Sequence, residues 1–446
     1  MSVPVSPNIG HYRYRILALV FMATTINYFD RSIVGVMAPT LQKMFSWTNS
    51  DYAAIMVSFK IAYGIGLLFM GGIIDRFGTR AGYTLSIAIW SIFGMLHAAV
   101  RPAFSLIGFI AVRFGLGIGE AGNFPAAIKT VAEWFPKKDR AFATGIFDAS
   151  TSVGAILAPF IVGAIVSVDG KNWQIPFLFT GVLSALWVFL WLKTYNKPEL
   201  HPRLSKEELN YINSDSEEEN AEKIPWLKLL PKKETWAFAL TTITDGVWWF
   251  YLFWGAKFLA EQFGVDIKNI GLPFLIIFIM ADAGSLLGGL ASGALIKKGW
   301  SINKARKITL LVNAIIILPV VFVPVIESKW LAVFLIGLGA AGHQSWSINS
   351  YTLVPDVFPK KATASVIGIG KMVGVAVAII ADLALGAVLD TADNSGYFWA
   401  FVIAGLSYIS ILGFVHLLMP KMTPLDDNLN YITEKPPIPP GGASIH

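Results

Sequence analysis

The sequence contains no cysteine among its 446 residues, and only 14% of its residues are charged. The absence of cysteine excludes a disulfide framework, thiolate catalysis and cysteine-based zinc or iron–sulfur sites. The low charge content argues against a soluble domain, in which about a quarter of the residues are charged. With 55% hydrophobic residues and a mean hydropathy of +0.60, the composition is that of a membrane protein.

The chain also lacks an apolar N-terminal segment followed by a small-residue cleavage site. We therefore expect no cleaved signal peptide, and we expect the first span to direct membrane insertion. The net charge of +6 does not indicate nucleic-acid binding, because most Lys and Arg lie in short loops between apolar segments. The six histidines are scattered, and neither a nucleophile triad nor a phosphate-binding glycine loop is evident, so we expect no metal, no cofactor and no enzymatic activity.

What the sequence does contain is a series of apolar segments, each long enough to cross a hydrocarbon core of about 30 Å. We place twelve of them at residues 16–39, 52–74, 82–100, 103–128, 141–166, 175–193, 236–258, 270–296, 307–325, 330–355, 362–388 and 396–419. The pattern predicts an all-α membrane protein with six-helix bundles at 1–193 and 236–420, a cytoplasmic linker at 194–235 and a disordered cytoplasmic tail at 421–446.

Basic residues are distributed unequally between the two sides of these spans. About 25 Lys and Arg fall on the side that holds both chain ends and the long loop, and about five fall on the other. Because cytoplasmic loops carry the excess of positive charge, this asymmetry places both termini in the cytoplasm.

The two halves of the chain are related by an internal repeat. The segment FPKKDRAFATGI at 135–146 matches FPKKATASVIGI at 358–369, an offset of 223, and GGIIDR at 71–76 matches GALIKK at 293–298. Duplicated halves with a site between them at the membrane midplane are typical of transporters. The offset also relates buried polar residues of the two halves: Glu120 to His343, Asp148 to Lys371, and Lys60 to the vicinity of Asp282.

Arg113 and Glu120 lie in the apolar run 105–127, on one helix face and about 10 Å apart. A charge at bilayer depth is costly and lies mainly against a partner or a watery cavity. The glycines between and beside the two residues allow another backbone or a ligand to approach. We interpret Arg113 as a carboxylate anchor with planar, two-pronged donors, and Glu120 as a proton carrier, because burial disfavours the charged carboxylate. The alternative is a structural role for both.

Four further charges are placed within spans, namely Lys60, Asp148, Asp245 and Lys371. Two acids and two bases indicate compensating pairs, and the repeat favours Asp148 with Lys371. The alternative is that a lysine binds a second acidic group of a substrate.

In the first span, Asp30 lies one turn beyond Asn27, so both can face a cavity. Adjacent helical residues diverge by about 100°, so Arg31 points elsewhere, toward Glu120 or another helix. In the second half, Asp245, Trp248 and Tyr251 recur every three residues. Aromatic residues in membrane helices usually pack or anchor at the interface, and contact with a sugar ring is the competing interpretation.

Several motifs carry a family resemblance. GGIIDRFGTR at 71–80 resembles the loop between the second and third helices of the major facilitator superfamily. NYFDR, RFGLGIGEAGNFPA and EWFPKKDRAFATGIF are similar to its anion:cation symporter branch. WWFYLFW at 248–254 and GHQSWSINSYTLVPDVFPKK at 342–361 most resemble hexuronate and aldonate transporters. The likeness extends from Tyr14 to about Pro420, but uncharged residues are commoner in that branch at the positions of Lys60, Asp148 and Lys371.

The resemblance implies a monomeric transporter in the plasma membrane, here the bacterial inner membrane, that imports a sugar acid anion by proton symport through alternating access. It implies proton coupling by Asp30 and Glu120, tuned by Arg31, and a gate latch at Asp75, Arg76 and Arg80. The candidate substrate-binding residues are Arg113, Tyr63, Lys60, Asn27, Thr151, Trp248, Tyr251, Trp254, His343, Gln344, Trp346, Ser347 and Lys371. The alternatives are an organic anion exchanger or exporter and, from another class, a transporter-like membrane receptor.

Overall fold

The computed structural model describes residues 10–214, 224–391 and 395–432. The first half contains α1 (Tyr12–Val36), α2 (Ala38–Phe45), α3 (Asn49–Leu96), α4 (Ser105–Glu120), α5 (Asn123–Trp134), α6 (Lys137–Ile165) and α7 (Ile175–Thr194). The short helix α8 (Lys206–Ile212) follows. The second half contains α9 (Lys233–Thr242), α10 (Asp245–Phe263), α11 (Gly271–Lys297), α12 (Ile302–Ile317), its 3-10 continuation η5 (Leu318–Val325), α13 (Lys329–Val357), α14 (Lys360–Thr391) and α15 (Ser395–Leu418). Short 3-10 turns lie at His97–Ala99, Pro102–Phe104, Pro198–Leu200 and Trp226–Lys228.

The described helices cross a membrane twelve times. Nine helical segments among the described residues are long and apolar enough to span a bilayer, and one of them, Asn49–Ala99, has 51 residues. That length corresponds to about 76 Å of helix, enough for two crossings of a core about 30 Å thick. The chain bends between these crossings at Gly78, whose φ of 79° is a conformation that residues with a side chain rarely adopt. The more polar α1 and the pair α9–α10 provide the remaining two crossings.

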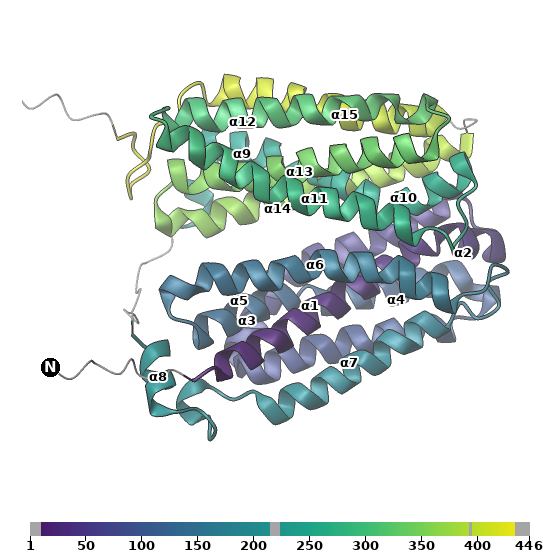
Figure 1. Ribbon diagram of the computed structural model, residues 1–446, viewed down its shortest axis with the longest axis horizontal. Helices are drawn as coiled ribbons and strands as arrows, with labels where there is room; N and C mark the ends of the chain where they lie inside the picture. The colour runs from purple at the N-terminus through teal and green to yellow at the C-terminus, as the bar shows by residue number, and fades with distance from the viewer. Residues whose placement is uncertain (1–9, 215–223, 392–394, 433–446) are drawn as a thin grey trace, which may run out of the picture.

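The helices form two bundles that lie side by side (Figure 1). The first bundle contains α1 to α7, and the second contains α9 to α15. We call the side on which α1 begins and α15 ends the terminus side, and the opposite one the far side. Two predicted spans are composite: α4 gives way to α5 after Glu120, and α9 gives way to α10 after Thr242.

Close backbone packing holds α4 between the two arms of α3, which are the parts of that helix before and after Gly78. A Cβ built on Gly117 would lie 2.6 Å from the carbonyl oxygen of Phe59, and one built on Gly119 would lie 2.5 Å from the backbone nitrogen of Trp90. Only glycine fits such contacts, because any side chain would push the helices apart. This packing confirms that the glycines of α4 serve close backbone approach, and it fixes Arg113 and Glu120 inside the first bundle.

The polar segments outside the bundles are partly ordered against them. Glu208 on α8 accepts hydrogen bonds from the backbone nitrogens of Tyr12 (3.1 Å) and Arg13 (3.0 Å), at the start of α1. The expectation of a disordered tail is wrong for residues 421–432. There the nitrogen of Leu425 donates to the carbonyl of Val357 (2.7 Å), because Leu425 is buried among apolar side chains of the second bundle. Residues 433–446 lie outside the described residues.

Candidate functional site

A buried ion pair connects α1 to α4. Nε of Arg31 lies 2.9 Å from Oε2 of Glu120, and both side chains are almost completely buried. Of the two directions expected for Arg31, the structure shows the one toward Glu120. The rings of Tyr28 and Tyr63 flank the guanidinium, with centroids at 4.6 and 4.8 Å. Asp30, on a different face of α1, is buried and interacts with Thr180 of α7.

Arg113 is buried without an ion pair in the described part of the chain. Its guanidinium lies 4.6 Å from the ring centroid of Phe59, and Nη2 is 3.8 Å from the sulfur of Met56. Nε and Nη1 have no hydrogen-bond partner. The ring of Phe253, which comes from α10 of the second bundle, lies 5.9 Å away. An arginine with free donors is thus covered by a side chain from the opposite bundle.

The two bundles are joined on the far side by hydrogen bonds and an ion pair. Nζ of Lys60 on α3 lies 2.6 Å from Oδ2 of Asp382 on α14, and both side chains are buried. Trp254 on α10 donates to the same carboxylate at 3.3 Å. Nearby, the hydroxyl of Tyr52 donates to the carbonyl of Phe253 at 2.5 Å. Asp390 accepts from the backbone nitrogens of Asn49 and Ser50, at 2.7 and 2.9 Å, at the start of α3.

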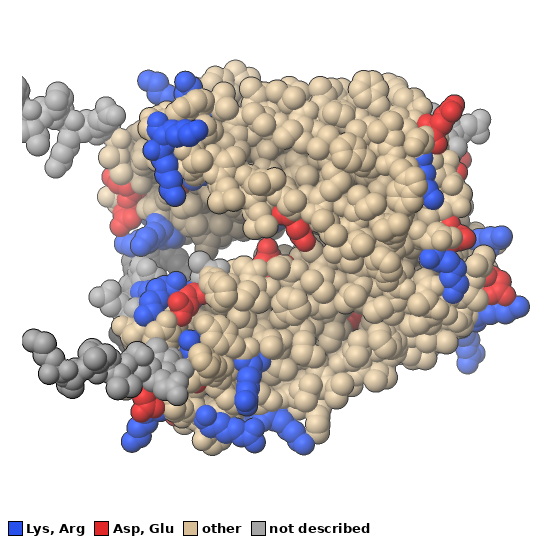
Figure 2. All heavy atoms as spheres, in the orientation of Figure 1, with Lys and Arg blue, Asp and Glu red and all other residues tan. Residues whose placement is uncertain are grey.

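Toward the terminus side, the surface between the bundles is hollowed, and acidic side chains are visible there (Figure 2). Nζ of Lys371 on α14 lies 2.7 Å from Oδ2 of Asp245 on α10, with 43% and 15% of the side chains exposed. The expected pairing of Lys371 with Asp148 is therefore wrong. Asp245 lies on a neighbouring helix of the same bundle, whereas Asp148 belongs to the other bundle, is exposed and forms no ion pair in the described residues. From that bundle, Ser152 donates to Asp282 of α11 at 2.6 Å.

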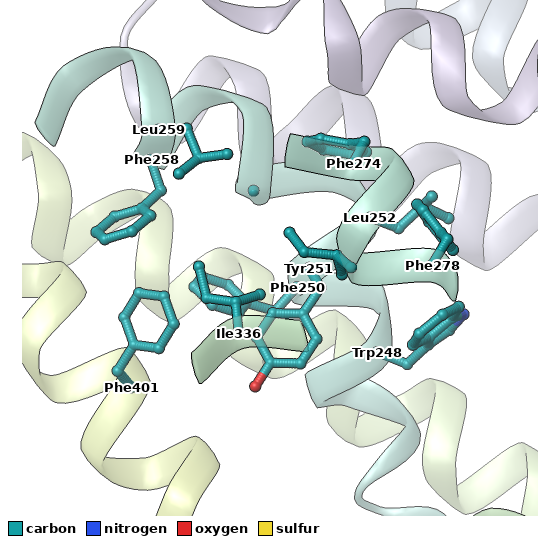
Figure 3. Close-up of a pocket in the computed structure, with 12 residues that line it drawn as sticks. Trp248, Phe250, Tyr251, Leu252, Phe258, Leu259, Phe274, Phe278, Ile336 and Phe401 are labelled. Carbon is teal, nitrogen blue, oxygen red and sulfur yellow. The ribbon is translucent and has the colours of Figure 1, made fainter. Parts of the chain in front are cut away.

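The aromatic candidates of α10 and α13 contact several different neighbours. Trp248 stacks on His343, with ring centroids 5.8 Å apart, and Nδ1 of His343 lies 2.7 Å from the hydroxyl of Tyr408. Tyr251 lies in an apolar pocket of the second bundle (Figure 3), whose cavity of about 10 Å³ has room for about one water and is too small for a sugar. Trp346 is fully buried, with Nε1 3.3 Å from the carbonyl of Thr241.

The other candidate binding residues lie in buried or half-buried positions. Asn27 is buried and accepts a hydrogen bond from Arg31 at 3.4 Å. Half-buried positions are occupied by Tyr63, Thr151, Gln344 and Ser347. In the described part of the chain, no three His, Asp or Glu side chains are grouped so as to hold a metal ion.

The charges of the loop between the two arms of α3 contact only the first bundle. Asp75 is exposed and pairs with Lys129 of α5 at 2.6 Å. Arg80 donates to the carbonyl of Leu192 on α7, and Arg76 lies against Phe77. None of these contacts crosses to the second bundle, so a latch between bundles at this loop stays a prediction.

Three residues of the far-side connection were not among the sequence candidates: Asp382, Tyr52 and Asp390. Asp382 had a usable signal, since an acid inside the span 362–388 requires a partner. Lys60 likewise requires one, because its own span, 52–74, contains no Asp or Glu. Tyr52 and Asp390 lie near span ends, where polar side chains are common, so the sequence gives no reason to single them out.

The chain is similar to a known family and to known proteins along most of its length. The model of the Major Facilitator Superfamily matches residues 20–381. A hexuronate transporter of Escherichia coli (strain K12) is 29% identical over 409 residues, covering 90% of this chain and 92% of that protein. A galacturonate transporter of Dickeya chrysanthemi is 30% identical over 313 residues, covering 69% and 89%. A probable galactarate/D-glucarate transporter of Bacillus subtilis (strain 168) is 27% identical over 425 residues, covering 90% and 92%.

Solved structures share the fold. A bacterial homologue of the human lysosomal transporter Spinster, in an inward-facing and occupied conformation, has a TM-score of 0.74 at 18% identity and covers 92% of this chain and 97% of its own. The xylose transporter of E. coli, in an inward open conformation, has a TM-score of 0.70 at 13% identity and covers 92% and 96%. The matched family and these relatives are transporters and not enzymes. With twelve spans in two bundles and a family match over most of its length, the chain belongs to the Major Facilitator Superfamily.

Proposed function

We propose that the protein imports a sugar acid together with protons by alternating access. The names of the hexuronate and galacturonate transporters to which it is similar support the substrate class. The observation that carries the proposal is Arg113: a buried guanidinium with two partnerless nitrogens, covered by Phe253 of the opposite bundle. Buried donors without partners are costly unless another state or ligand satisfies them.

In this proposal the bundles separate on the far side when the transporter accepts substrate. Separation removes Phe253 from Arg113 and opens its donors to a carboxylate that arrives from outside. The planar guanidinium then holds that carboxylate through two parallel hydrogen bonds. The sugar hydroxyls contact the half-buried polar and aromatic side chains of both bundles, among them Tyr63, Gln344 and Ser347. Closure on the far side and release through the terminus-side hollow complete the cycle.

Proton coupling is proposed to act through the pair of Arg31 and Glu120. A proton on Glu120 removes the charge that holds Arg31, so protonation and rearrangement of α1 against α4 are linked. Asp30 is the second proposed carrier, since it is buried near both Arg113 and Glu120. An anion that moves inward against 100 mV costs about 2.3 kcal/mol, and one proton that moves with it cancels that cost, so accumulation is driven by the pH gradient or by a second proton.

The proposed orientation follows from charge. The terminus side carries most of the Lys and Arg, so in this proposal it faces the cytoplasm. The similarity to a bacterial transporter supports the bacterial inner membrane as the location, and we propose a monomer as the working unit. In that orientation the described conformation is closed to the outside and hollowed toward the cytoplasm, as expected after substrate has been released.

One observation favours a second candidate, exchange of a doubly charged anion. Lys371 has 43% of its side chain exposed between the bundles, so a second carboxylate could displace Asp245 from it. The similarity to a probable galactarate/D-glucarate transporter supports this candidate, because those two substrates carry two carboxylates.

The test is uptake of labelled galacturonate into proteoliposomes in sodium-free buffer. Import with protons predicts that outside acid accelerates uptake and that a protonophore abolishes accumulation. Accumulation that requires only an internal dicarboxylate would favour exchange, binding without accumulation would favour a receptor, and strict sodium dependence would refute proton coupling.

A further inference from the structure

A groove on the outer surface of the second bundle lies between α12 and α15. These two helices lie on the face of that bundle that points away from the first bundle (Figure 1). The groove is an open depression of about 670 Å³ at the terminus end of both helices. It belongs neither to the space between the bundles nor to the transport site proposed above.

One end of the groove is basic. Lys304 and Lys307 of α12 and His416 of α15 line it, and no Asp or Glu is among its lining residues. Nζ of Lys307 donates to the carbonyls of Met419 (2.6 Å) and Pro420 (2.8 Å), at the end of α15. In the described part of the chain, neither lysine forms an ion pair, so their positive charges are not balanced by a carboxylate of the protein.

The other end of the groove is apolar and faces the lipid. Leu311 and Ile409 line it with 38% and 39% of their surface exposed. Between them and the basic end lies Gly413, where an added Cβ would meet no atom within 4 Å. Seven residues separate Lys304 from Leu311, so the groove follows α12 for about 10 Å.

The depth of the basic end matches that of phospholipid headgroups. Nζ of Lys304 lies 4.5 Å from the ring centroid of Trp300, and tryptophan is enriched at membrane–water interfaces. Figure 2 also shows Lys and Arg gathered at this end of the second bundle. An occupant must therefore carry an anionic group at the interface and an apolar chain that extends into the hydrocarbon.

We propose that this groove is a binding site for an anionic phospholipid. The phosphate lies against Lys304 and Lys307, and an acyl chain lies along the notch at Gly413 between α12 and α15. Basic pockets between membrane helices on the cytoplasmic side are a recurring means of holding anionic headgroups. A lipid seated there would fasten α15, the last helix, to α12 without taking part in transport chemistry.

The test is native mass spectrometry of the full-length protein titrated with phosphatidylglycerol, and with phosphatidylcholine of the same acyl chains. The wild type is expected to retain phosphatidylglycerol preferentially. Lys304→Gln should weaken that binding about fivefold, as expected for one lysine near an anionic surface. Gly413→Phe should abolish the preference, because it fills the notch while every charge remains. Both variants spare Lys307, whose contacts with the end of α15 make its replacement a risk for folding.

Two controls distinguish the site from general charge attraction. Lys298→Gln removes a lysine at the same end of the bundle but outside the groove, and it should leave binding unchanged. Glycerol phosphate, which has the headgroup charge and no acyl chain, should not compete. The proposal is overturned if both groove variants bind like the wild type, if Lys298→Gln weakens binding as much as Lys304→Gln does, or if glycerol phosphate competes.

Discussion

Neutralising either member of the pair Lys60–Asp382 should open the far side of the protein. Both side chains are buried, and removal of one leaves the other charge unpaired at the contact between bundles. Breaking a buried ion pair in this way costs about 3–5 kcal/mol. Separation of the bundles would let water reach the remaining charge, so the substitution destabilises the closed conformation relative to the open one. If about 3 kcal/mol shifts the balance toward opening, the open population rises about 150-fold.

The absence of native cysteine makes this opening directly measurable. Ala53 on α3 is fully buried and faces Gly386 of α14 across the bundle contact, so Ala53→Cys is a reporter that needs no other cysteine removed. Its reaction with a membrane-impermeant maleimide should be slow in the wild-type background. It should be about ten- to 150-fold faster with Lys60→Met or Asp382→Asn, because labelling follows the open population. The double variant, with neither charge, should react more slowly than either single variant.

A matched control removes a buried lysine that does not join the bundles. Nζ of Lys257 contacts Glu261 one turn away on the same helix, α10, and its side chain is 4% exposed. Lys257→Met should therefore leave labelling of the reporter unchanged. The reasoning is refuted if the two single variants label at the wild-type rate while remaining folded, or if Lys257→Met accelerates labelling as much as they do.

Three further outcomes are expected. Arg113→Lys keeps the charge but loses the two-pronged geometry, so binding of galacturonate measured by calorimetry should weaken about tenfold or more, and unchanged affinity would remove Arg113 as the anchor. Glu120→Gln should keep exchange of substrate across the membrane and lose gradient-driven accumulation, whereas loss of binding itself would contradict its role as a proton carrier. In a double-mutant cycle followed by thermal unfolding, Lys371→Met and Asp245→Asn should show a coupling free energy of about 1 kcal/mol or less, since the lysine is partly exposed. The effects of Asp148→Asn and Lys371→Met on the free energy of unfolding should simply add, because these two residues do not pair.

Much of the fold follows from the sequence because membrane spans are long and apolar, and their number and order can be read from hydropathy alone. The contact of Arg31 with Glu120 could also be predicted as one of two alternatives. The side chains of adjacent helical residues point in different directions, so Arg31 could not share the face of Asp30. The glycines of α4 predicted close packing for the same kind of local reason.

The charge partners between distant helices could not be read from the repeat. A repeat relates residues that hold equivalent positions in the two bundles, and equivalence is not contact. Lys371 pairs with Asp245 on a neighbouring helix of its own bundle, and Lys60 pairs with Asp382, which the repeat does not relate to it. These partners depend on how the helices pack within the second bundle and between the two bundles, which is a property of the assembled fold.

The neighbours of the aromatic run of α10 could not be predicted for a different reason. Positions three apart share only part of a helix face, and each ring meets a different neighbour: Trp248 meets His343, Tyr251 enters an apolar pocket, and Trp254 reaches Asp382. Local periodicity predicts which way a side chain points, but it does not say whether a substrate or another helix lies there.

The most direct test of the proposed function is whether substrate carries protons with it. Proteoliposomes that contain a pH-sensitive dye are given an inward gradient of galacturonate and no initial pH gradient. The proposal predicts acidification of the lumen with the wild type and none with Glu120→Gln, while exchange of labelled substrate continues in that variant. Uptake of labelled galacturonate by the wild type without any acidification would contradict proton symport.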